Sequence, residues 1–181
     1  VPMPEPVLYI AGDVHDDGGG TAFTAFLDRL RGRPVARLVI LGDLVEYWIE
    51  TEACVRRHGD LLGRLKGLRQ AGWSIDLVRG NREIVAGRRL EAACGARLVW
   101  PALDVQLGPR RVRVVHGDRL CQDPSYRLYS AFMRGFWMRA IQGLPPAPLQ
   151  EAVARTLRAR SQAGHRKPAR QRIFIDPRRV A

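Results

Sequence analysis

Residues 35–43, with the sequence VARLVILGD, decide the fold class of this chain. The stretch is apolar apart from one arginine, and it ends abruptly at a glycine and an aspartate, as a buried strand does when it reaches a turn. Residues 7–11 and 73–78 repeat the pattern, and each run ends close to a glycine. Three such runs predict three buried strands of one sheet.

The segments between these runs have helical periodicity. Thr21 is placed to cap a helix that ends at Gly32, and apolar residues at helical spacing predict further helices over about 53–70 and 84–93. Residues 103–107 and 111–115 are typical of a hairpin that turns at a Gly-Pro pair. Alternating strands and helices followed by a hairpin predict a layered α/β fold, with mixed β-sheets flanked by helices.

The character of the chain changes at about residue 124, so we predict a core over 1–124 and a C-terminal helical cap over 125–181. Residues 1–124 hold 18 Lys and Arg against 16 Asp and Glu, whereas residues 125–181 hold 12 against 2, a net charge of +10. A field of this sign attracts the phosphates of nucleic acids, anionic lipids or nucleotides. A solvated basic tail is the alternative explanation.

Size and cysteine content further narrow the kinds of protein that this sequence could form. A chain of 181 residues suits one domain, and its apolar runs are shorter than the roughly 20 residues that span a bilayer. The three cysteines are scattered, which argues against a disulfide framework and fits a reducing compartment. We found no secretory signal, so a cytoplasmic location is expected.

Four polar clusters stand where apolar strands are predicted to end. They are Asp13-Val14-His15, Gly42-Asp43, Gly80-Asn81-Arg82 and His116-Gly117-Asp118. In open α/β sheets, groups at the carboxyl ends of strands converge on one crevice. A single aspartate after a strand usually begins a turn or caps a helix, but four clusters led by oxygen or imidazole ligands indicate one shared site.

The order of these clusters resembles the calcineurin-like metallophosphoesterases. The strings LGDLVEYWI at 41–49, RGNRE at 79–83 and HGDRLC at 116–121 are similar to the branch that contains the UDP-2,3-diacylglucosamine hydrolases. Arg82 sets this branch apart, since most of the superfamily has His or Asp directly after the asparagine. The resemblance runs from about residue 7 to the end of the chain.

This resemblance implies a site for two divalent metal ions. Asp13 and His15 would hold one ion, Asn81 and His116 the other, and Asp43 would bridge them. Hard cations prefer such oxygen and imidazole ligands. Mn²⁺ is the expected metal, with Mg²⁺ or another divalent ion as the alternative.

The reaction implied by the family is hydrolysis of the pyrophosphate of UDP-2,3-diacylglucosamine, which gives UMP and 2,3-diacylglucosamine 1-phosphate in lipid A biosynthesis. A metal pair activates water and stabilises an in-line displacement at phosphorus. Asn81 and Arg82 are the expected catalytic residues. The amide NH₂ of Asn81 is available for a phosphoryl oxygen, and Arg82 offers a permanently charged fork that also binds substrate.

Substrate and membrane contacts are expected in the C-terminal part. An aromatic helix over 125–142 belongs either to the core or to a cap that accepts acyl chains and lies peripherally on the inner face of the inner membrane. By resemblance, Arg158, Ser161 and Lys167 contact the substrate. His165 is expected to be a surface residue or substrate contact, and His58 to be solvated.

The chain departs from the family pattern in two places. The family's downstream Gly-His-x-His motif, which completes both metal sites, does not occur here. We therefore expect either a piece of a longer protein, which we favour, or a shortened relative with incomplete sites. Glu83 stands where the nearest branch usually has Asp.

Two other functions compete with the lipid-nucleotide hydrolase. One is a metallophosphoesterase for another nucleotide, a nucleic acid or a phosphoprotein. The other is a non-catalytic, basic phosphate- or nucleic-acid-binding protein, which would bind duplexes with a steep salt dependence. Because zinc-finger and RNP-type strings do not occur, no specific nucleic-acid partner is expected. The sequence leaves the oligomeric state open.

Overall fold

The computed structural model describes residues 7–20, 22–83 and 86–120, together with positions 124, 128 and 131. The chain divides into two compact units, Val1–His116 and Gly117–Ala181. All strands of the described residues belong to the first unit. The only complete element described in the second unit is a short 3-10 helix, η1 (Gly117–Leu120).

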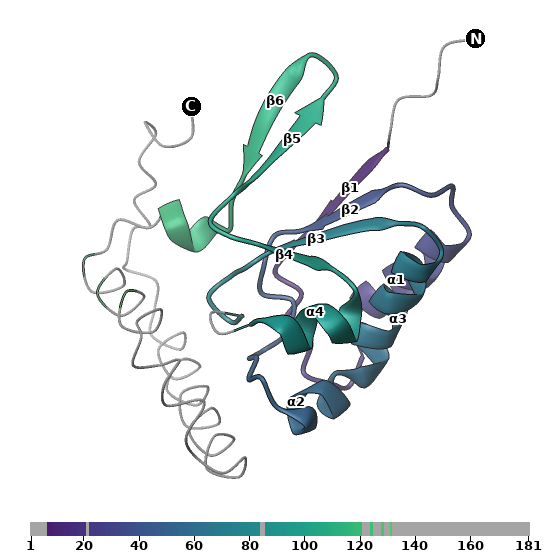
Figure 1. Cartoon of the computed structure of the whole chain (residues 1–181), viewed down its shortest axis with the longest axis vertical. Coiled ribbons are helices and arrows are strands. Elements are labelled where there is room, and N and C mark those ends of the chain that lie inside the picture. Colours follow the sequence, from purple (N-terminus) through teal and green to yellow (C-terminus); the bar gives the residue numbers. More distant parts are fainter. Residues whose placement is uncertain are drawn as a thin grey trace. The chain divides into compact units, whose positions relative to one another are not determined.

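A four-stranded parallel sheet forms the centre of the first unit (Figure 1). Its strands are β1 (Leu8–Ala11), β2 (Arg37–Ile40), β3 (Ser74–Val78) and β4 (Arg97–Val99), in the order β1-β2-β3-β4. Since neighbours in sequence are neighbours in the sheet, the ends of β1, β2 and β3 lie along the same edge. This edge carries three of the four polar clusters.

The helices cover one face of this sheet (Figure 1). They are α1 (Ala22–Arg31), α2 (Glu52–Arg57), α3 (Gly59–Gln70) and α4 (Arg88–Cys94). Leu38 and Ile40 of β2 point into this layer, where they pack with the fully buried leucines of α3. Val39 points to the opposite face, as the two-residue period of a strand requires. The sheet is therefore apolar on both sides, which is typical of parallel strands.

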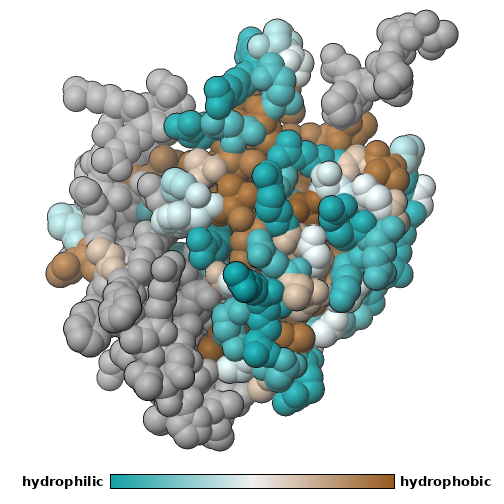
Figure 2. Space-filling model, viewed as in Figure 1, coloured by the Kyte–Doolittle hydropathy of each residue, from teal (hydrophilic) through white to brown (hydrophobic). Residues whose placement is uncertain are grey.

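A hairpin of β5 (Leu103–Leu107) and β6 (Arg110–Val114) packs against that opposite face. Its buried residues Leu103, Val105 and Val114 join Val39 and Val78 in a second, smaller core. Figure 2 shows apolar residues gathered between the hairpin and the parallel sheet. The end of β6 leads directly to His116.

The predicted fold class is confirmed, because a parallel sheet and an antiparallel hairpin are combined with flanking helices. Two helix predictions were wrong in their bounds. The single helix expected over 53–70 is broken at His58, and the helix expected over 84–93 begins at Arg88. Strand β4 was not predicted, since three residues are too few to establish a pattern.

The predicted cap over 125–181 lies outside the described residues, apart from positions 128 and 131. Its boundary with the core therefore stays a prediction. Within the part of the chain that the structure describes, no helix has both the length and the apolar character required to cross a membrane. Cys54 and Cys94 are buried, and Cys121 lies outside the described residues.

Candidate metal centre

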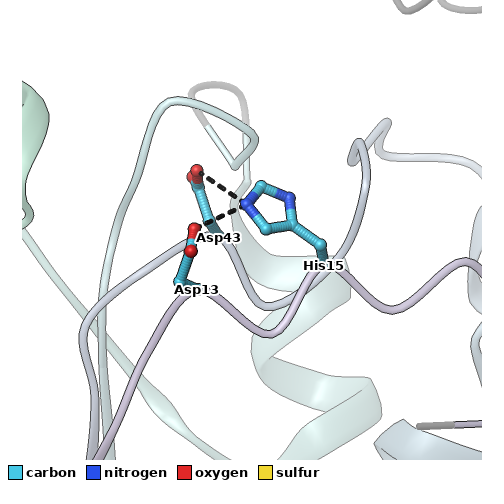
Figure 3. Close-up of side chains that lie close together, drawn as sticks. All are labelled: Asp13, His15 and Asp43. Carbon is cyan, nitrogen blue, oxygen red and sulfur yellow. Dashed lines mark hydrogen bonds and ion pairs between the residues drawn. The ribbon is translucent and has the colours of Figure 1, made fainter. Parts of the chain in front are cut away.

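Asp13, His15 and Asp43 form a cluster at the edge of the parallel sheet (Figure 3). The side chains of Asp13 and His15 come from the loop after β1, and that of Asp43 comes from the loop after β2. Each offers one ligand atom, and the three atoms lie within 4.8 Å of one another. His15 Nε2 is 2.7 Å from Asp13 Oδ1 and 3.7 Å from Asp43 Oδ2.

The two loops are joined by backbone hydrogen bonds. The N–H of His15 donates to the carbonyl of Asp43 at 2.9 Å, and that of Asp16 donates to the carbonyl of Leu44 at 3.1 Å. Asp16 and Val45 form an isolated parallel bridge. Hydrogen bonds between the two backbone segments therefore hold the cluster in place. Within the cluster, Asp13 is exposed, His15 is half-buried and Asp43 is only 4% exposed.

His116 reaches the same carboxylate from the end of β6. Its Nε2 lies 3.6 Å from Asp43 Oδ1, while its Nδ1 lies 2.5 Å from the carbonyl oxygen of Leu41. A carbonyl only accepts hydrogen bonds, so Nδ1 carries the proton and Nε2 keeps its lone pair for a cation. The two oxygens of Asp43 therefore face two different imidazoles, one from each side.

Asn81 and Arg82 occupy the turn after β3, next to Asp43. The N–H of Arg82 donates to Asp43 Oδ1 at 3.1 Å, and its guanidinium Nε lies 4.0 Å from Asp43 Oδ2. Arg82 is mostly buried, with a side chain 20% exposed, and Asn81 is half-buried in the same turn. The third strand end thus contributes a permanent positive charge beside the carboxylate.

The backbone in this region is strained and closely packed. Asp13, His15 and Asp43 have φ angles of 57°, 50° and 51°, a left-handed conformation that non-glycine residues seldom adopt. Gly42 has a φ of 82°, and a Cβ there would lie 2.6 Å from the backbone nitrogen of Gly80. The close approach of the β2 and β3 loops therefore requires glycine. Strain of this kind is concentrated at functional sites.

Glu83 holds these loops together, a role that the sequence analysis missed. Its carboxyl group is fully buried and accepts the N–H groups of Asp43, Val45 and Gly80 at 2.9, 3.2 and 3.2 Å. Burial, followed by the nearby charge of Asp43, raises the pKa of Glu83 to about 7. Its position two residues after Asn81 was the available signal.

The residues present suit a divalent cation. Two carboxylates and an imidazole converge within a few ångströms, with a second imidazole 3.6 Å from Asp43. Among the described residues the donors are oxygen and imidazole, which favour Mn²⁺, Mg²⁺ or a similar hard or borderline ion. The other predicted contacts, Arg158, Ser161 and Lys167, lie outside the described residues, as does His165.

A parallel sheet and an antiparallel hairpin flanked by helices, with a carboxylate–imidazole cluster at the strand ends, are compatible with a metallophosphoesterase fold. No family model matches the chain. The chain is 32% identical over 181 residues to a UDP-2,3-diacylglucosamine hydrolase of Ralstonia nicotianae, covering 97% of this chain and 66% of that protein. It is 33% identical over 179 residues to the hydrolase of the same name from Serratia proteamaculans, covering 96% of this chain and 73% of that protein.

A third relative of the same name, from Sodalis glossinidius, is 35% identical over 158 residues, with coverage of 85% of this chain and 66% of that protein. This chain therefore belongs to the UDP-2,3-diacylglucosamine hydrolase family, within the metallophosphoesterase superfamily. The family resemblance inferred from residues 41–49, 79–83 and 116–121 is confirmed. The chain spans about two thirds of the length of the curated relatives that it matches, 66% for the Ralstonia protein.

Proposed function

We propose that this protein hydrolyses the pyrophosphate bond of UDP-2,3-diacylglucosamine and releases UMP and 2,3-diacylglucosamine 1-phosphate, a step of lipid A biosynthesis. The observation that carries the proposal is the convergence of ligand atoms from Asp13, His15 and Asp43 within 4.8 Å. The substrate comes from the relatives, which are named UDP-2,3-diacylglucosamine hydrolases. A carboxylate–imidazole cluster suits metal-assisted hydrolysis.

We further propose that the centre holds two divalent cations, with Mn²⁺ as the first candidate. Asp13 and His15 would hold one ion, and Asn81 and His116 the other. Asp43 would serve both, which agrees with its two oxygens facing His15 at 3.7 Å and His116 at 3.6 Å. When bound, such a pair supplies Lewis-acid activation of water and of the phosphoryl group.

The chain's own residues would orient the substrate. Arg82 lies beside Asp43, so its guanidinium can form two parallel hydrogen bonds with a phosphoryl group at the same place. Asn81 contributes a neutral amide. Its NH₂ can donate to a phosphoryl oxygen while its carbonyl oxygen binds a metal ion. His116 keeps one tautomer because Leu41 accepts its Nδ1 proton. These groups would align the pyrophosphate before attack.

A lipid-linked nucleotide substrate would be met at a membrane surface. We propose a cytoplasmic protein that binds peripherally to the inner face of the inner membrane, attracted through the +10 net charge of residues 125–181. Arg158, Ser161 and Lys167 are the proposed substrate contacts in that region. The proposal involves no specific nucleic-acid partner.

The test is to measure UMP release from UDP-2,3-diacylglucosamine in the presence of Mn²⁺, with bis(p-nitrophenyl) phosphate as a generic diester. We expect the lipid nucleotide to be hydrolysed, and Asp43→Asn to lower the rate by more than about 100-fold. Asp104→Asn, which changes a partly exposed carboxylate of the β5–β6 hairpin, is the matched control and should leave the rate unchanged.

Turnover of the generic diester alone would reject the lipid substrate and favour another phosphoesterase. A third result would reject hydrolysis altogether: no turnover of either compound, with salt-sensitive binding of duplex nucleic acid that persists in Asp43→Asn.

A further inference from the structure

Asp16 and His58 form a buried ionisable pair behind the candidate metal centre. Each is 1% exposed, and Asp16 Oδ2 lies 2.7 Å from His58 Nδ1. A carboxylate oxygen accepts hydrogen bonds, so Nδ1 of His58 donates to Asp16, and burial lowers the pKa of the His58 ring. His58 was expected to be solvated, and that prediction was wrong. The pair has no part in the chemistry proposed above.

Asp16 directly follows His15, and both its backbone and its side chain are hydrogen-bonded. Its backbone N–H donates to Leu44 and its carbonyl accepts from Glu46 at 2.9 Å. Its Oδ2 accepts from Gly18 at 3.1 Å as well as from His58. Asp16 thus joins the loop after β1 to the loop that carries Asp43.

His58 provides a rigid partner for this loop. It lies at the junction of α2 and α3, where its N–H donates to Cys54 at 3.2 Å and its carbonyl accepts from Leu62 at 3.0 Å. The backbone of His58 is therefore fixed by both helices. Its ring extends the helical layer to Asp16, 42 residues away in the sequence.

The strained residues next to Asp16 need such an anchor. Asp13 and His15 keep left-handed backbones only if the surrounding structure holds them there. The side chain of Asp13 is 84% exposed, so packing of that side chain does not hold it. The anchoring contacts follow in the next three residues: the N–H of His15 donates to Asp43, and Asp16 makes the remaining ones.

Stability alone does not explain why these positions are polar. Asp16 Oδ1 and His58 Nε2 are buried, and neither finds a hydrogen-bond partner among the residues that the structure describes. An apolar pair of similar size would fill the same space without leaving two polar atoms unsatisfied. A buried polar pair can instead serve to fix one arrangement of the chain, as is established for some proteins.

We infer that the Asp16–His58 pair is a positioning device for the metal centre, which holds residues 13–15 so that Asp13 and His15 face Asp43. The inference rests on the proposed metal site. Asp16 and His58 act through the backbone, so they are positioning residues and not ligands. Loss of their hydrogen bond would lower the affinity for the cation before it disturbed the core.

Two variants of nearly equal size separate the hydrogen bond from packing. In His58→Asn the side-chain amide replaces Nδ1–H as the donor, whereas His58→Leu has no donor. We expect His58→Asn to bind Mn²⁺ within about twofold of the unaltered protein, and His58→Leu to bind about 10-fold more weakly. The free Mn²⁺ signal in electron paramagnetic resonance gives both dissociation constants.

Hydrogen exchange of the metal-free protein provides a second readout. His58→Leu should speed the exchange of the His15 and Asp16 amides, while the amides of β2 and β3 keep their protection. Equal Mn²⁺ affinity in the two variants, or faster exchange throughout the molecule, would overturn the inference. If His58→Leu fails to fold, Asp16→Asn and Asp16→Leu make the same comparison, because only the former keeps an acceptor.

The two proposals fail in different ways. If the unaltered protein binds no Mn²⁺, the metal site is rejected and the claim about affinity is rejected with it. If the unaltered protein binds Mn²⁺ and His58→Leu binds it equally well, the metal site stands and the positioning role is rejected.

Discussion

The carboxyl group of Glu83 accepts the backbone N–H of Asp43 at 2.9 Å, from a position 40 residues further along the chain. The same group accepts from Val45 and Gly80, so one buried side chain joins the loops that follow β2 and β3. The Glu83 carboxyl group thus provides hydrogen-bond acceptors for three buried N–H groups that water does not reach. The placement of Asp43 thus depends on a residue that is not proposed to touch metal or substrate.

Glu83→Ala should therefore destabilise the metal-free protein by about 3 kcal/mol, because it leaves three buried donors unpaired. Glu83→Gln should cost less, about 1–2 kcal/mol, since one oxygen remains. Urea denaturation followed by circular dichroism measures both values. Equal stability of the alanine variant and the unaltered protein would contradict this role.

Gly80 should be intolerant of a side chain. A Cβ there would lie 2.7 Å from the backbone nitrogen of Asp43 and 3.1 Å from Cε1 of His116. We expect Gly80→Ala to lower the free energy of unfolding by about 2 kcal/mol and to weaken Mn²⁺ binding, because neither neighbour can move without shifting the centre. Calorimetric titration with Mn²⁺ and urea denaturation test the two effects.

Gly63→Ala is the control for Gly80→Ala. Gly63 lies within α3, and a Cβ there would have no neighbour within 4 Å. Since alanine has a higher helix propensity than glycine, the free energy of unfolding of this variant should rise by about 1 kcal/mol, and its Mn²⁺ affinity should be unchanged. A loss of Mn²⁺ binding in Gly63→Ala would show that the measurement does not report on the centre alone.

The sequence predicted the strands and the convergence of polar groups because both depend on local patterns. Apolar runs that end at Gly-Asp or Gly-Asn place Asp13, Asp43 and Asn81 on one edge of a parallel sheet, whatever the details of packing. The structure brings Asp13, His15 and Asp43 together and adds His116 at 3.6 Å from Asp43. That these residues bind metal stays a prediction.

The contacts behind the site could not be predicted in this way. Glu83 and His58 are charged or polar residues in stretches that look exposed, and they contact Asp43 and Asp16, which are 40 and 42 residues away. No periodic pattern links such positions, since they meet only when loops and helices pack. The helix breaks at His58, the residue whose ring contacts Asp16, and such a tertiary contact is not visible in the sequence.

Asp76 gives a stability prediction away from the centre. It lies in β3, is 4% exposed, and accepts from Arg37 at 2.6 Å and from Arg97 at 2.7 Å. Asp76→Asn should lower the free energy of unfolding by about 1–2 kcal/mol, a modest value because both arginines are partly exposed and screened by solvent. Urea denaturation at low and high salt measures the loss.

Asp104→Asn is the matched control for Asp76→Asn. Asp104 likewise accepts from two arginines, Arg111 and Arg113, but its side chain is 25% exposed and both arginines are largely exposed. Solvent-exposed ion pairs contribute little to the free energy of unfolding, so Asp104→Asn should leave it nearly unaltered. A larger loss for Asp104→Asn than for Asp76→Asn would contradict the importance of burial.

His58 should make the stability of the metal-free protein depend on pH. Burial lowers the pKa of His58 below 6.5, an effect that Asp16 opposes only in part. The unfolded chain therefore takes up a proton at a pH where the folded protein does not. The resulting contribution is present above about pH 6.5 and is lost as the pH falls through the lowered pKa, by at most about 1.4 kcal/mol per pH unit.

His58→Asn isolates this contribution, because asparagine keeps the donor to Asp16 and does not titrate. Between about pH 7.5 and 5, its free energy of unfolding should fall less steeply than that of the unaltered protein, with EDTA present to exclude metal. Arg57 and Asp17, the other charges that act on the ring, are unchanged in the variant and cancel in the comparison. Parallel profiles would mean that the pKa of His58 is the same in the folded and the unfolded chain, and would contradict a pKa lowered by burial.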